Sequence, residues 1–279
     1  MGPNPPATRC KRTARIVITA PTLQLVRIRL RVRELERSVD FYRGALGFVV
    51  SARESATARL AVAPGAEAIL ELTADASLTP PEPSAAGLFH AALLLPSRAA
   101  LGAWLRHAAE AGVRFEGFAD HGVSEAIYFS DPDGNGLEFY VDRPRERWPQ
   151  ATNGELAMVT EPLDLPGLLA AAPAPTPHPL MGAQWGHLHL RVTHLERSDH
   201  FYREALKLQL MQGSFPGARF LAADGYHHHL GLNAWGRPTQ PVNAATTGLA
   251  LATFASAQAS APELVRDPDG NGVELIPLR

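Results

Sequence analysis

The first quarter of the chain shows two hydrophobic periods in succession. Residues Leu25–Val32 alternate apolar side chains with arginine, which is the period of a half-buried strand. The segment Glu34–Leu46 then places its apolar residues at helical spacing, and Gly47 ends it. Short strands are predicted at 58–62 and 68–72. This order predicts a strand, a helix and further strands packed on one core.

The same order follows once more. A strand is predicted at Gly87–Leu95, and Pro96-Ser97 introduces a helix over Arg98–Ala111. Ala126–Ser130 and Gly136–Val141 read as strands joined by Asp-Pro-Asp-Gly-Asn-Gly, which is strong hairpin chemistry. The fold class is therefore α+β, built from strand–helix–strands modules.

The chain repeats itself at a fixed offset. The segment Leu30–Leu46 returns as Leu190–Leu206, 160 residues later, and the turn that begins at Ser130 returns from Arg266. Self-similarity of this kind indicates a duplicated architecture. Two modules in each half are therefore expected, with the halves related by an approximate two-fold.

The second half is shorter than the first. Gly87 and Asp131 are 44 positions apart, but their counterparts Gly248 and Asp267 are only 19 apart. The 25 missing positions carried the second helix and the strand after it. What remains, Ser256–Pro262, is too short and polar for a packed helix. The fourth module is predicted to be truncated, and we expect its uncovered face to be covered by another chain or by residues 163–169.

These patterns divide the chain into four segments. Residues 1–22 are rich in proline and arginine and are predicted to be a disordered tail. Residues 23–145 form the first domain and 183–279 the second, truncated one. Residues 146–182 are rich in proline and alanine and form a connector.

The composition of the chain limits the kinds of partner that it is expected to bind. With 26 basic and 28 acidic residues the net charge is −2, so nothing points to nucleic acid or to an anionic membrane. No apolar run approaches the roughly 20 residues that span a bilayer. A single cysteine, Cys10, excludes an intramolecular disulfide framework and fits a reducing cytosol. A cytoplasmic protein with a small-molecule partner is expected, and a homo-oligomer is a further possibility.

The repeated turn superficially resembles the start of a calcium loop. Asp131, Asp133 and Asn135 have the right spacing, but their flanks read as strands, whereas that loop needs helices. The second copy also puts Leu278 at the twelfth position. A hairpin turn is the better interpretation.

Several long motifs carry a family resemblance. They are the LxVxxLERSxxFYRxxL segment after each first strand, the DPDGNG-[LV]-E hairpin, GLFHAALLLPSR at Gly87 and YHHHLGLNAW at Tyr226. Together these motifs resemble the vicinal oxygen chelate superfamily of glyoxalases, bleomycin-resistance proteins and extradiol dioxygenases, and within it the catechol 2,3-dioxygenase subgroup. The resemblance covers roughly residues 24–279. It implies paired βαβββ modules that curl into a cup around a divalent metal, Fe²⁺ or alternatively Mn²⁺.

The resemblance also implies ligand positions. His187 falls at a first-strand ligand position and Glu274 at the last-strand carboxylate, while the remaining position reads Leu251. The run Tyr226–His229 supplies alternatives, and alternation along a strand would turn His227 and His229 into the cup. We predict His187, His229 and Glu274 as the ligands, with His227 as an alternative second imidazole.

The first half offers another set. His90 and Glu138 match family ligand positions, and Glu71 is a possible third ligand, but Arg27 stands where a histidine is expected and would repel a cation. Tyr128 lies ten residues before Glu138, as the family's catalytic tyrosine does. Tyr128, His121 and Tyr226 are the candidates for moving protons.

The resemblance implies ring cleavage of a catechol-like aromatic diol by O₂, as in aromatic catabolism. Two histidines and one carboxylate leave metal positions open for both hydroxyl oxygens and for O₂. Two alternatives remain open. One is a non-catalytic or resistance-type binding protein of the same fold, and the other is an inactive, truncated paralogue.

Overall fold

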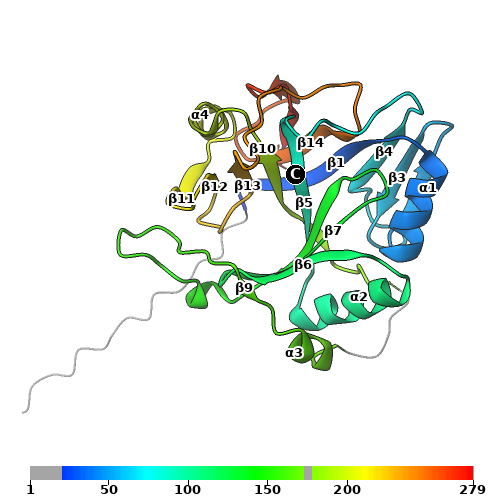
Figure 1. Cartoon of the computed structure of the whole chain (residues 1–279), viewed down its shortest axis with the longest axis horizontal. Helices are drawn as coiled ribbons and strands as arrows, with labels where there is room; N and C mark the ends of the chain where they lie inside the picture. The colour runs from blue at the N-terminus through cyan, green and yellow to red at the C-terminus, as the bar shows by residue number, and fades with distance from the viewer. Residues whose placement is uncertain (1–20, 173–177, 279) are drawn as a thin grey trace, which may run out of the picture.

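The computed structural model describes residues 21–172 and 178–278. The predicted tail, 1–22, lies almost entirely outside the described residues, as does Cys10. No helix among the described residues is long and apolar enough to cross a membrane. The predicted mixed architecture is confirmed, because two large sheets carry a small number of helices on their faces (Figure 1).

The described residues form four strand-rich modules along the chain. Their strands are β1 (Leu23–Val32), β2 (Val49–Arg53), β3 (Thr57–Ala61) and β4 (Leu70–Ala74) in module 1; β5 (Gly87–Leu94), β6 (Phe115–Asp120), β7 (Ser124–Ser130) and β8 (Gly136–Asp142) in module 2; β10 (Gln184–Arg191), β11 (Gln209–Gln212), β12 (Ala218–Ala222) and β13 (Leu230–Asn233) in module 3; and β14 (Gly248–Ser256), β15 (Glu263–Arg266) and β16 (Gly272–Pro277) in module 4. The short strand β9 (Glu161–Pro162) belongs to the connector.

The helices lie where the spacing predicts them. The first runs as α1 (Leu35–Asp40) and a π-helical turn η1 (Phe41–Ala45), and Gly47 follows with a φ of +92°. In module 2, the helix α2 (Arg98–Glu110) begins after Ser97, whose hydroxyl caps it by accepting from the amide of Ala100. The other helices are α3 (Leu165–Ala170), the helix α4 (Leu195–Ala205) of module 3 and a 3₁₀ turn η2 (Arg145–Arg147).

The modules pair across the two halves of the chain. Module 1 pairs with module 4, because β1 runs antiparallel to β14 in a seven-stranded sheet of order β15-β16-β14-β1-β4-β3-β2. Module 2 pairs with module 3 through β5 and β10 in a nine-stranded sheet of order β11-β12-β13-β10-β5-β8-β7-β6-β9. Each sheet therefore takes strands from both repeats, and the expectation that each half builds its own paired-module unit is wrong.

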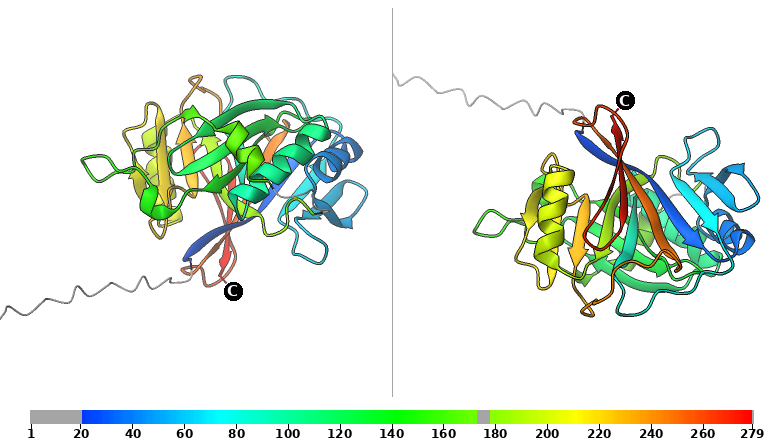
Figure 2. Two further views of the ribbon diagram at one scale, coloured as in Figure 1. Left: turned by 90° about the horizontal axis from the view of Figure 1, so that it is seen from below. Right: turned by 90° about the horizontal axis from the view of Figure 1, so that it is seen from above.

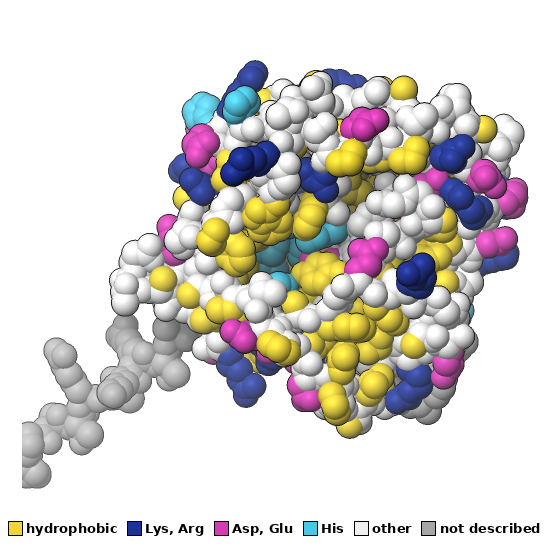
Figure 3. All heavy atoms as spheres, viewed as in Figure 1, with side chains coloured by type: hydrophobic (Ala, Val, Ile, Leu, Met, Phe, Trp, Pro, Cys, Tyr) yellow, Lys and Arg dark blue, Asp and Glu magenta, His cyan; other side chains and the backbone are white. Residues whose placement is uncertain are grey.

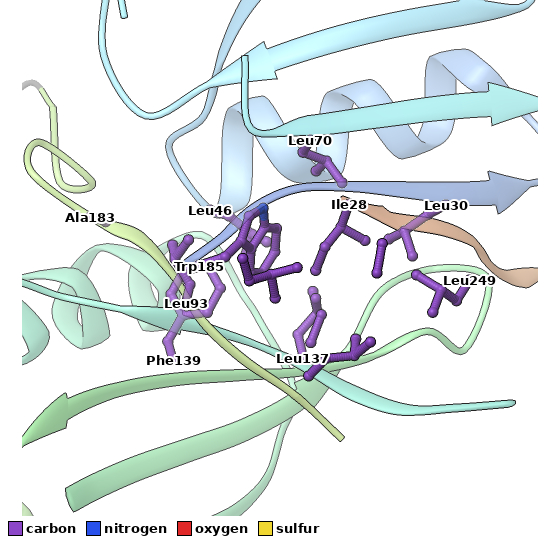
Figure 4. Close-up of a cluster of buried hydrophobic side chains, with 14 of the residues drawn as sticks. Ile28, Leu30, Leu46, Leu70, Leu93, Leu137, Phe139, Ala183, Trp185 and Leu249 are labelled. Carbon is purple, nitrogen blue, oxygen red and sulfur yellow. The ribbon is translucent and has the colours of Figure 1, made fainter. Parts of the chain in front are cut away.

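One apolar cluster joins both sheets. Side chains of β1, such as Ile28 and Leu30, meet those of β5 and β8, such as Leu93 and Leu137, with Trp185 of β10 at one end (Figure 4). Alternation turns these residues inward and leaves the opposite face of each sheet for other side chains. The functional residues described below lie on those opposite faces.

The repeated motifs contact each other within each half. The Tyr42 hydroxyl of the first helix donates to the carboxylate of Asp131, and the Tyr202 hydroxyl donates in the same way to Asp267. Each aspartate also accepts from backbone amides of its own DPDGNG turn. The turn is therefore a hairpin, as predicted. Its own carboxylate holds it, and it ties the helix of one module to the next module.

The fourth module lacks a crossover helix, as predicted. Residues 257–262 form turns between β14 and β15. The apolar residues of β14 and β16 are nonetheless buried within the chain, Phe254 and Val273 among them. The connector helix α3 packs on α2 at the far end of the molecule from β14 (Figures 1 and 2). The expected cover of module 4 by residues 163–169 is therefore wrong.

Candidate metal centre

Three buried side chains converge on one face of the nine-stranded sheet. His90 comes from β5, Glu138 from the neighbouring parallel strand β8, and His187 from the antiparallel strand β10 on the other side of β5. Their potential ligand atoms all lie within 4.8 Å of one another. We call the face that carries them the His face. Because β5 and β10 belong to different repeats, neither half of the chain could form this group by itself.

Both imidazoles point at the same carboxylate oxygen. Nε2 of His90 lies 3.0 Å and Nε2 of His187 lies 3.1 Å from Oε2 of Glu138. Only His187 has hydrogen-bonding geometry, and within the described residues Nε2 of His90 is a buried nitrogen with no hydrogen-bond partner. Two imidazole nitrogens and a carboxylate oxygen on one face form a donor set that suits a divalent transition metal.

The electrostatics favour the forms of these groups that bind a cation. Burial would raise the pKa of Glu138, but His187 and His90 outweigh it and hold that pKa well below its usual value. Burial lowers the pKa of His187 to about 4, against the attraction of Glu138. At neutral pH, Glu138 is therefore a carboxylate and His187 a neutral imidazole, which are the protonation states that metal binding requires.

A cavity of about 380 Å³ opens above His90 and Glu138. Its walls are mostly apolar and come from both repeats and from the connector; they include Phe89, Phe118, Val123, Met158, Phe220 and Trp235. In the space-filling view, histidines lie at the floor of a hollow ringed by hydrophobic side chains (Figure 3). The volume of the cavity is sufficient for a small ring-shaped molecule, and among the described residues its lining includes no lysine or arginine that could bind an anionic substituent.

Two further histidines border this cavity, His189 of β10 and His228 in the turn before β13. The His228 ring packs on that of His187, with 4.0 Å between the centroids. Burial and the neighbouring histidines lower the pKa of both His189 and His228 well below the ordinary value. Both rings are therefore neutral at pH 7 and can accept a proton.

The predicted pair Tyr128 and His121 also lies at the cavity. Nδ1 of His121 is 2.6 Å from the carbonyl oxygen of Val159, and its Nε2 is 2.7 Å from the Tyr128 hydroxyl. Because a carbonyl only accepts, a neutral His121 ring donates from Nδ1 and accepts the phenolic hydrogen at Nε2. Burial raises the pKa of Tyr128 well above its ordinary value, with a further contribution from Glu138. Tyr128 is thus a protonated phenol facing the cavity.

The run of histidines does not lie as predicted. Residues 226–229 form an irregular turn, and β13 begins only at Leu230, so strand alternation does not apply to them. His229 accepts a hydrogen bond at Nδ1 from the amide of Ala223 and lines a second cavity away from the metal group. Tyr226 lines that second cavity too, which leaves it away from the apolar cavity in which we expected it.

The predicted carboxylate Glu274 lies on the other sheet. It accepts a hydrogen bond from the Thr253 hydroxyl at 2.9 Å and lies 3.7 Å from the guanidinium of Arg27. Glu71 is likewise paired with Arg29 at 2.8 Å. Neither carboxylate belongs to the His90–Glu138–His187 group. The expected convergence of His187, His229 and Glu274 is therefore wrong in its geometry, and His187 instead joins His90 and Glu138 of the alternative set.

Sequence reasoning missed His189 and His228 as cavity residues. The HLH pattern of β10 was the signal for His189, because side chains two apart on a strand share a face with His187. No local pattern identified His228, because its direction depends on an irregular turn. Gly231 also matters here, because a Cβ at that position would lie 2.8 Å from the His189 ring.

The chain is similar in sequence to known proteins. The sequence model of the Glyoxalase/Bleomycin resistance protein/Dioxygenase superfamily matches residues 24–139. A Bacillus subtilis (strain 168) protein named catechol-2,3-dioxygenase is 42% identical over 223 residues, which is 77% of this chain and 77% of that protein.

Solved structures show the same fold at low identity. Glyoxalase I from Zea mays superposes with a TM-score of 0.54 at 16% identity, over 91% of this chain and 92% of that one. The cppA protein from Streptococcus pneumoniae TIGR4 superposes with a TM-score of 0.51 at 14% identity, over 91% and 99% of the two chains. These likenesses concern the fold alone.

Proposed function

The chain belongs to the Glyoxalase/Bleomycin resistance protein/Dioxygenase superfamily, and we propose on that premise that it is a metal-dependent extradiol dioxygenase. The observation that carries the proposal is the convergence of His90, Glu138 and His187 beside an apolar cavity that the first two of them line. Two imidazoles and one carboxylate on one face are the donor set of non-haem Fe(II) oxygenases. Fe²⁺ is therefore the proposed metal, and Mn²⁺ the alternative.

The proposed substrates are an aromatic ring with two adjacent hydroxyls and O₂. When bound, the metal ion supplies a chelating centre for the two hydroxyl oxygens and a redox-active one for O₂. The cavity residues supply the rest. Apolar walls such as Phe220 and Trp235 would contact the two faces and the edge of the ring. The connector residue Met158 closes one side of the cavity.

Proton transfers are assigned to residues at the cavity wall. His228 is neutral and beside His187, so it can take a proton from a substrate hydroxyl held at the metal ligands. On the other side, Tyr128 keeps its proton and donates it to His121, and the same hydroxyl would turn from His121 to donate to an oxygen that gains negative charge. A base and a donor on opposite sides of one ring suit a reaction that begins with deprotonation.

The truncated fourth module does not argue for an inactive paralogue. Module 4 belongs to the seven-stranded sheet, whereas all three residues of the metal group lie on the nine-stranded sheet. The missing helix therefore removes nothing from the cavity wall. A non-catalytic binding protein stays the alternative, and it would use the same apolar cavity without a metal.

A matched pair of variants tests the proposal. The protein is purified without oxygen, loaded with Fe(II), and assayed for bound iron and for ring cleavage of catechol. Glu138→Gln should lose both, because it removes the carboxylate ligand. Glu274→Gln, the equivalent change in the other repeat, should retain both. Iron binding and cleavage that survive Glu138→Gln would overturn the ligand assignment, and wild-type protein that binds no metal would favour the binding-protein alternative.

A further inference from the structure

A chain of hydrogen bonds leads away from the cavity behind His228. Nδ1 of His228 lies 2.8 Å from Nδ1 of His227, and Nε2 of His227 lies 2.8 Å from Oδ1 of Asp142. His227 is fully buried, while the Asp142 side chain is 28% exposed and lines the second cavity. The chain thus links a ring at the proposed active site to a carboxylate on a different surface of the protein.

Two tyrosines hold the carboxylate in place. The Tyr226 hydroxyl donates to Oδ1 of Asp142 at 3.1 Å, and the Tyr140 hydroxyl lies 2.8 Å from the Tyr226 hydroxyl. Burial raises the pKa of both phenols well above the ordinary value, so both keep their protons. Since the Tyr226 hydrogen points to Asp142, Tyr140 donates to Tyr226. Asp142 is therefore the acceptor at which these hydrogen bonds end.

The positions of the hydrogens follow from donor and acceptor counting. A carboxylate only accepts, so His227 must carry its hydrogen on Nε2 to bond Asp142. A neutral His227 then has a lone pair on Nδ1. The contact of two Nδ1 atoms at 2.8 Å needs one hydrogen between them, and it must come from His228. A neutral His228 with its hydrogen on Nδ1 has a lone pair on Nε2.

We propose that Asp142, acting through His227, fixes the tautomer of His228 so that its Nε2 presents a lone pair to the cavity. Asp142 and His227 are positioning residues, because neither borders the apolar cavity. Among the described residues the ring of His228 makes its hydrogen bond at Nδ1, which leaves Nε2 for a molecule in the cavity. With the opposite tautomer, Nε2 would carry a hydrogen and could not accept a proton from the substrate.

The consequence for catalysis rests on the proposed function. A base that accepts the proton of a bound diol must be in the right tautomer before the substrate arrives, since rearrangement at the moment of reaction adds to the barrier. The hydrogen-bond chain keeps the ring in that state. Without it, His228 can adopt either tautomer, and only part of the protein would be ready to react.

The tautomer can be measured without catalysis. In full-length protein labelled with ¹⁵N-histidine and loaded with Zn(II), which is diamagnetic, imidazole ¹H–¹⁵N correlation shows which nitrogen carries the hydrogen. The His228 signals are assigned by their loss in His228→Gln. Wild-type protein should show the hydrogen on Nδ1. Asp142→Ala and His227→Phe should both shift His228 toward the Nε2–H form.

Two variants serve as controls. Asp224→Ala removes a carboxylate from the wall of the same second cavity that has no hydrogen bond to His227, so the tautomer should not change. His227→Gln should restore the wild-type tautomer, because an amide can accept from Nδ1–H of His228 and donate to Asp142. A hydrogen on Nε2 in the wild type, or an unchanged tautomer in Asp142→Ala, would overturn the proposal.

Kinetics separate this inference from the proposed function. In iron-loaded protein, Asp142→Ala should lower kcat by about 10²-fold, the scale of a lost acid–base catalyst, while iron content stays at the wild-type level. Asp224→Ala should keep the wild-type kcat. If wild-type protein cleaves no catechol, the proposed function is wrong, and the tautomer prediction is then decided by the imidazole ¹H–¹⁵N correlation alone. An unchanged kcat in Asp142→Ala would refute the catalytic consequence.

Discussion

The two sheets of this protein are built to the same register but carry different chemistry. In the nine-stranded sheet His189 pairs with His90 across the repeat boundary and with Gly231 on its other side. In the seven-stranded sheet the equivalent Arg29 pairs with Leu251 and with Glu71. The backbone frame is therefore duplicated, and side chains alone distinguish the two faces.

The seven-stranded sheet has an Arg face where the other sheet has its His face. On the Arg face we count Arg27, Arg29, Glu71 and Glu274, with Arg27 and Glu274 in the places of His187 and Glu138. Fixed guanidinium charges satisfy the carboxylates there and would repel a cation. Their side chains are also partly exposed, with Arg27 at 42% and Glu274 at 27%, against 1% and 3% for His187 and Glu138.

The comparison shows which features a metal site needs beyond the fold. A carboxylate on the last strand is present on both faces, so Glu138 and Glu274 do not distinguish them. The histidines of the first strands do distinguish them, and so does burial. The proposed metal site therefore depends on neutral donors in place of arginines and on burial of those donors.

The largest expected effect comes from removing a ligand on the His face. His187→Ala should reduce iron affinity by more than about 10²-fold, because even changes to residues that merely support a metal ligand cost 10- to 100-fold. Ring cleavage should fall with it. Arg27→Ala, at the equivalent place on the Arg face, should leave both unchanged. Metal analysis and oxygen uptake measure the two outcomes. Equal losses in the two variants would contradict the assignment of the metal to the His face.

Introducing histidines on the Arg face tests whether the strand register alone is sufficient to build a metal site. Arg27→His combined with Leu251→His should create a second His–Glu–His group with Glu274, because the strand register is the same on both faces. Zinc titration should show a second equivalent, bound more weakly because the Arg face is more exposed and Arg29 remains. Arg27→His alone should show none. A double variant without the second equivalent would show that burial, not register, limits the Arg face.

The histidines around the His face also predict how stability depends on pH. Burial lowers the pKa of His187 and of His229 to about 4, while unfolded chains protonate histidine below about pH 6.5. The unfolded state therefore binds more protons at acidic pH. The contribution of these two histidines to the free energy of unfolding is therefore fully present above about pH 6.5, and it is lost as pH falls toward about 4.

For metal-free protein the loss between pH 7 and pH 5 should approach about 2 kcal/mol for each of these two histidines. Urea denaturation at both pH values measures it. His229→Gln should show a smaller loss than the wild type, whereas His194→Gln, at an exposed position, should show the wild-type loss. The Arg face has no histidine and should contribute nothing in this range. A stability that does not change between pH 7 and pH 5 would contradict the burial of these rings as neutral groups.

The smallest effect is expected from the ion pair on the Arg face. Arg27 and Glu274 are 3.7 Å apart and partly exposed, so a double-mutant cycle of Arg27→Ala and Glu274→Gln should give a coupling below about 1 kcal/mol. Thermal denaturation in low and high salt measures it. A coupling of several kcal/mol would mean that the Arg face has a structural role that its exposure does not suggest.

Much of the fold follows from local pattern. The helix of residues 35–45, the helix of 98–110 and the hairpins at Asp131 and Asp267 lie where periodicity and turn chemistry predict them. The strand Val49–Arg53 was missed because three of its five residues are exposed and give no clear alternation. The strand Phe115–Asp120, which follows the second helix, was not placed by residue number because its burial alternates poorly.

The site followed from pattern only in part. The family motifs identified His187, His90 and Glu138 individually, but they were assigned to rival sites in different halves. Arg27 made the first-half set look unsuitable, because nothing in the sequence shows that His187 fills the corresponding place beside His90. The error at His229 has a local cause, since the residues before Leu230 do not form a strand.

The sequence by itself determined the duplicated modules, the truncation of the fourth, and the residue types that can bind a metal. Periodicity and turn chemistry depend on neighbouring residues, and internal repeats are found by comparing the sequence with itself, so none of them requires the tertiary structure. Only the tertiary structure decided that β10 pairs with β5 and that β1 pairs with β14. Strand edges in all four modules offer similar hydrogen-bonding groups, so the choice among them depends on how the shared core packs, and that choice placed His187 beside His90 and Glu138.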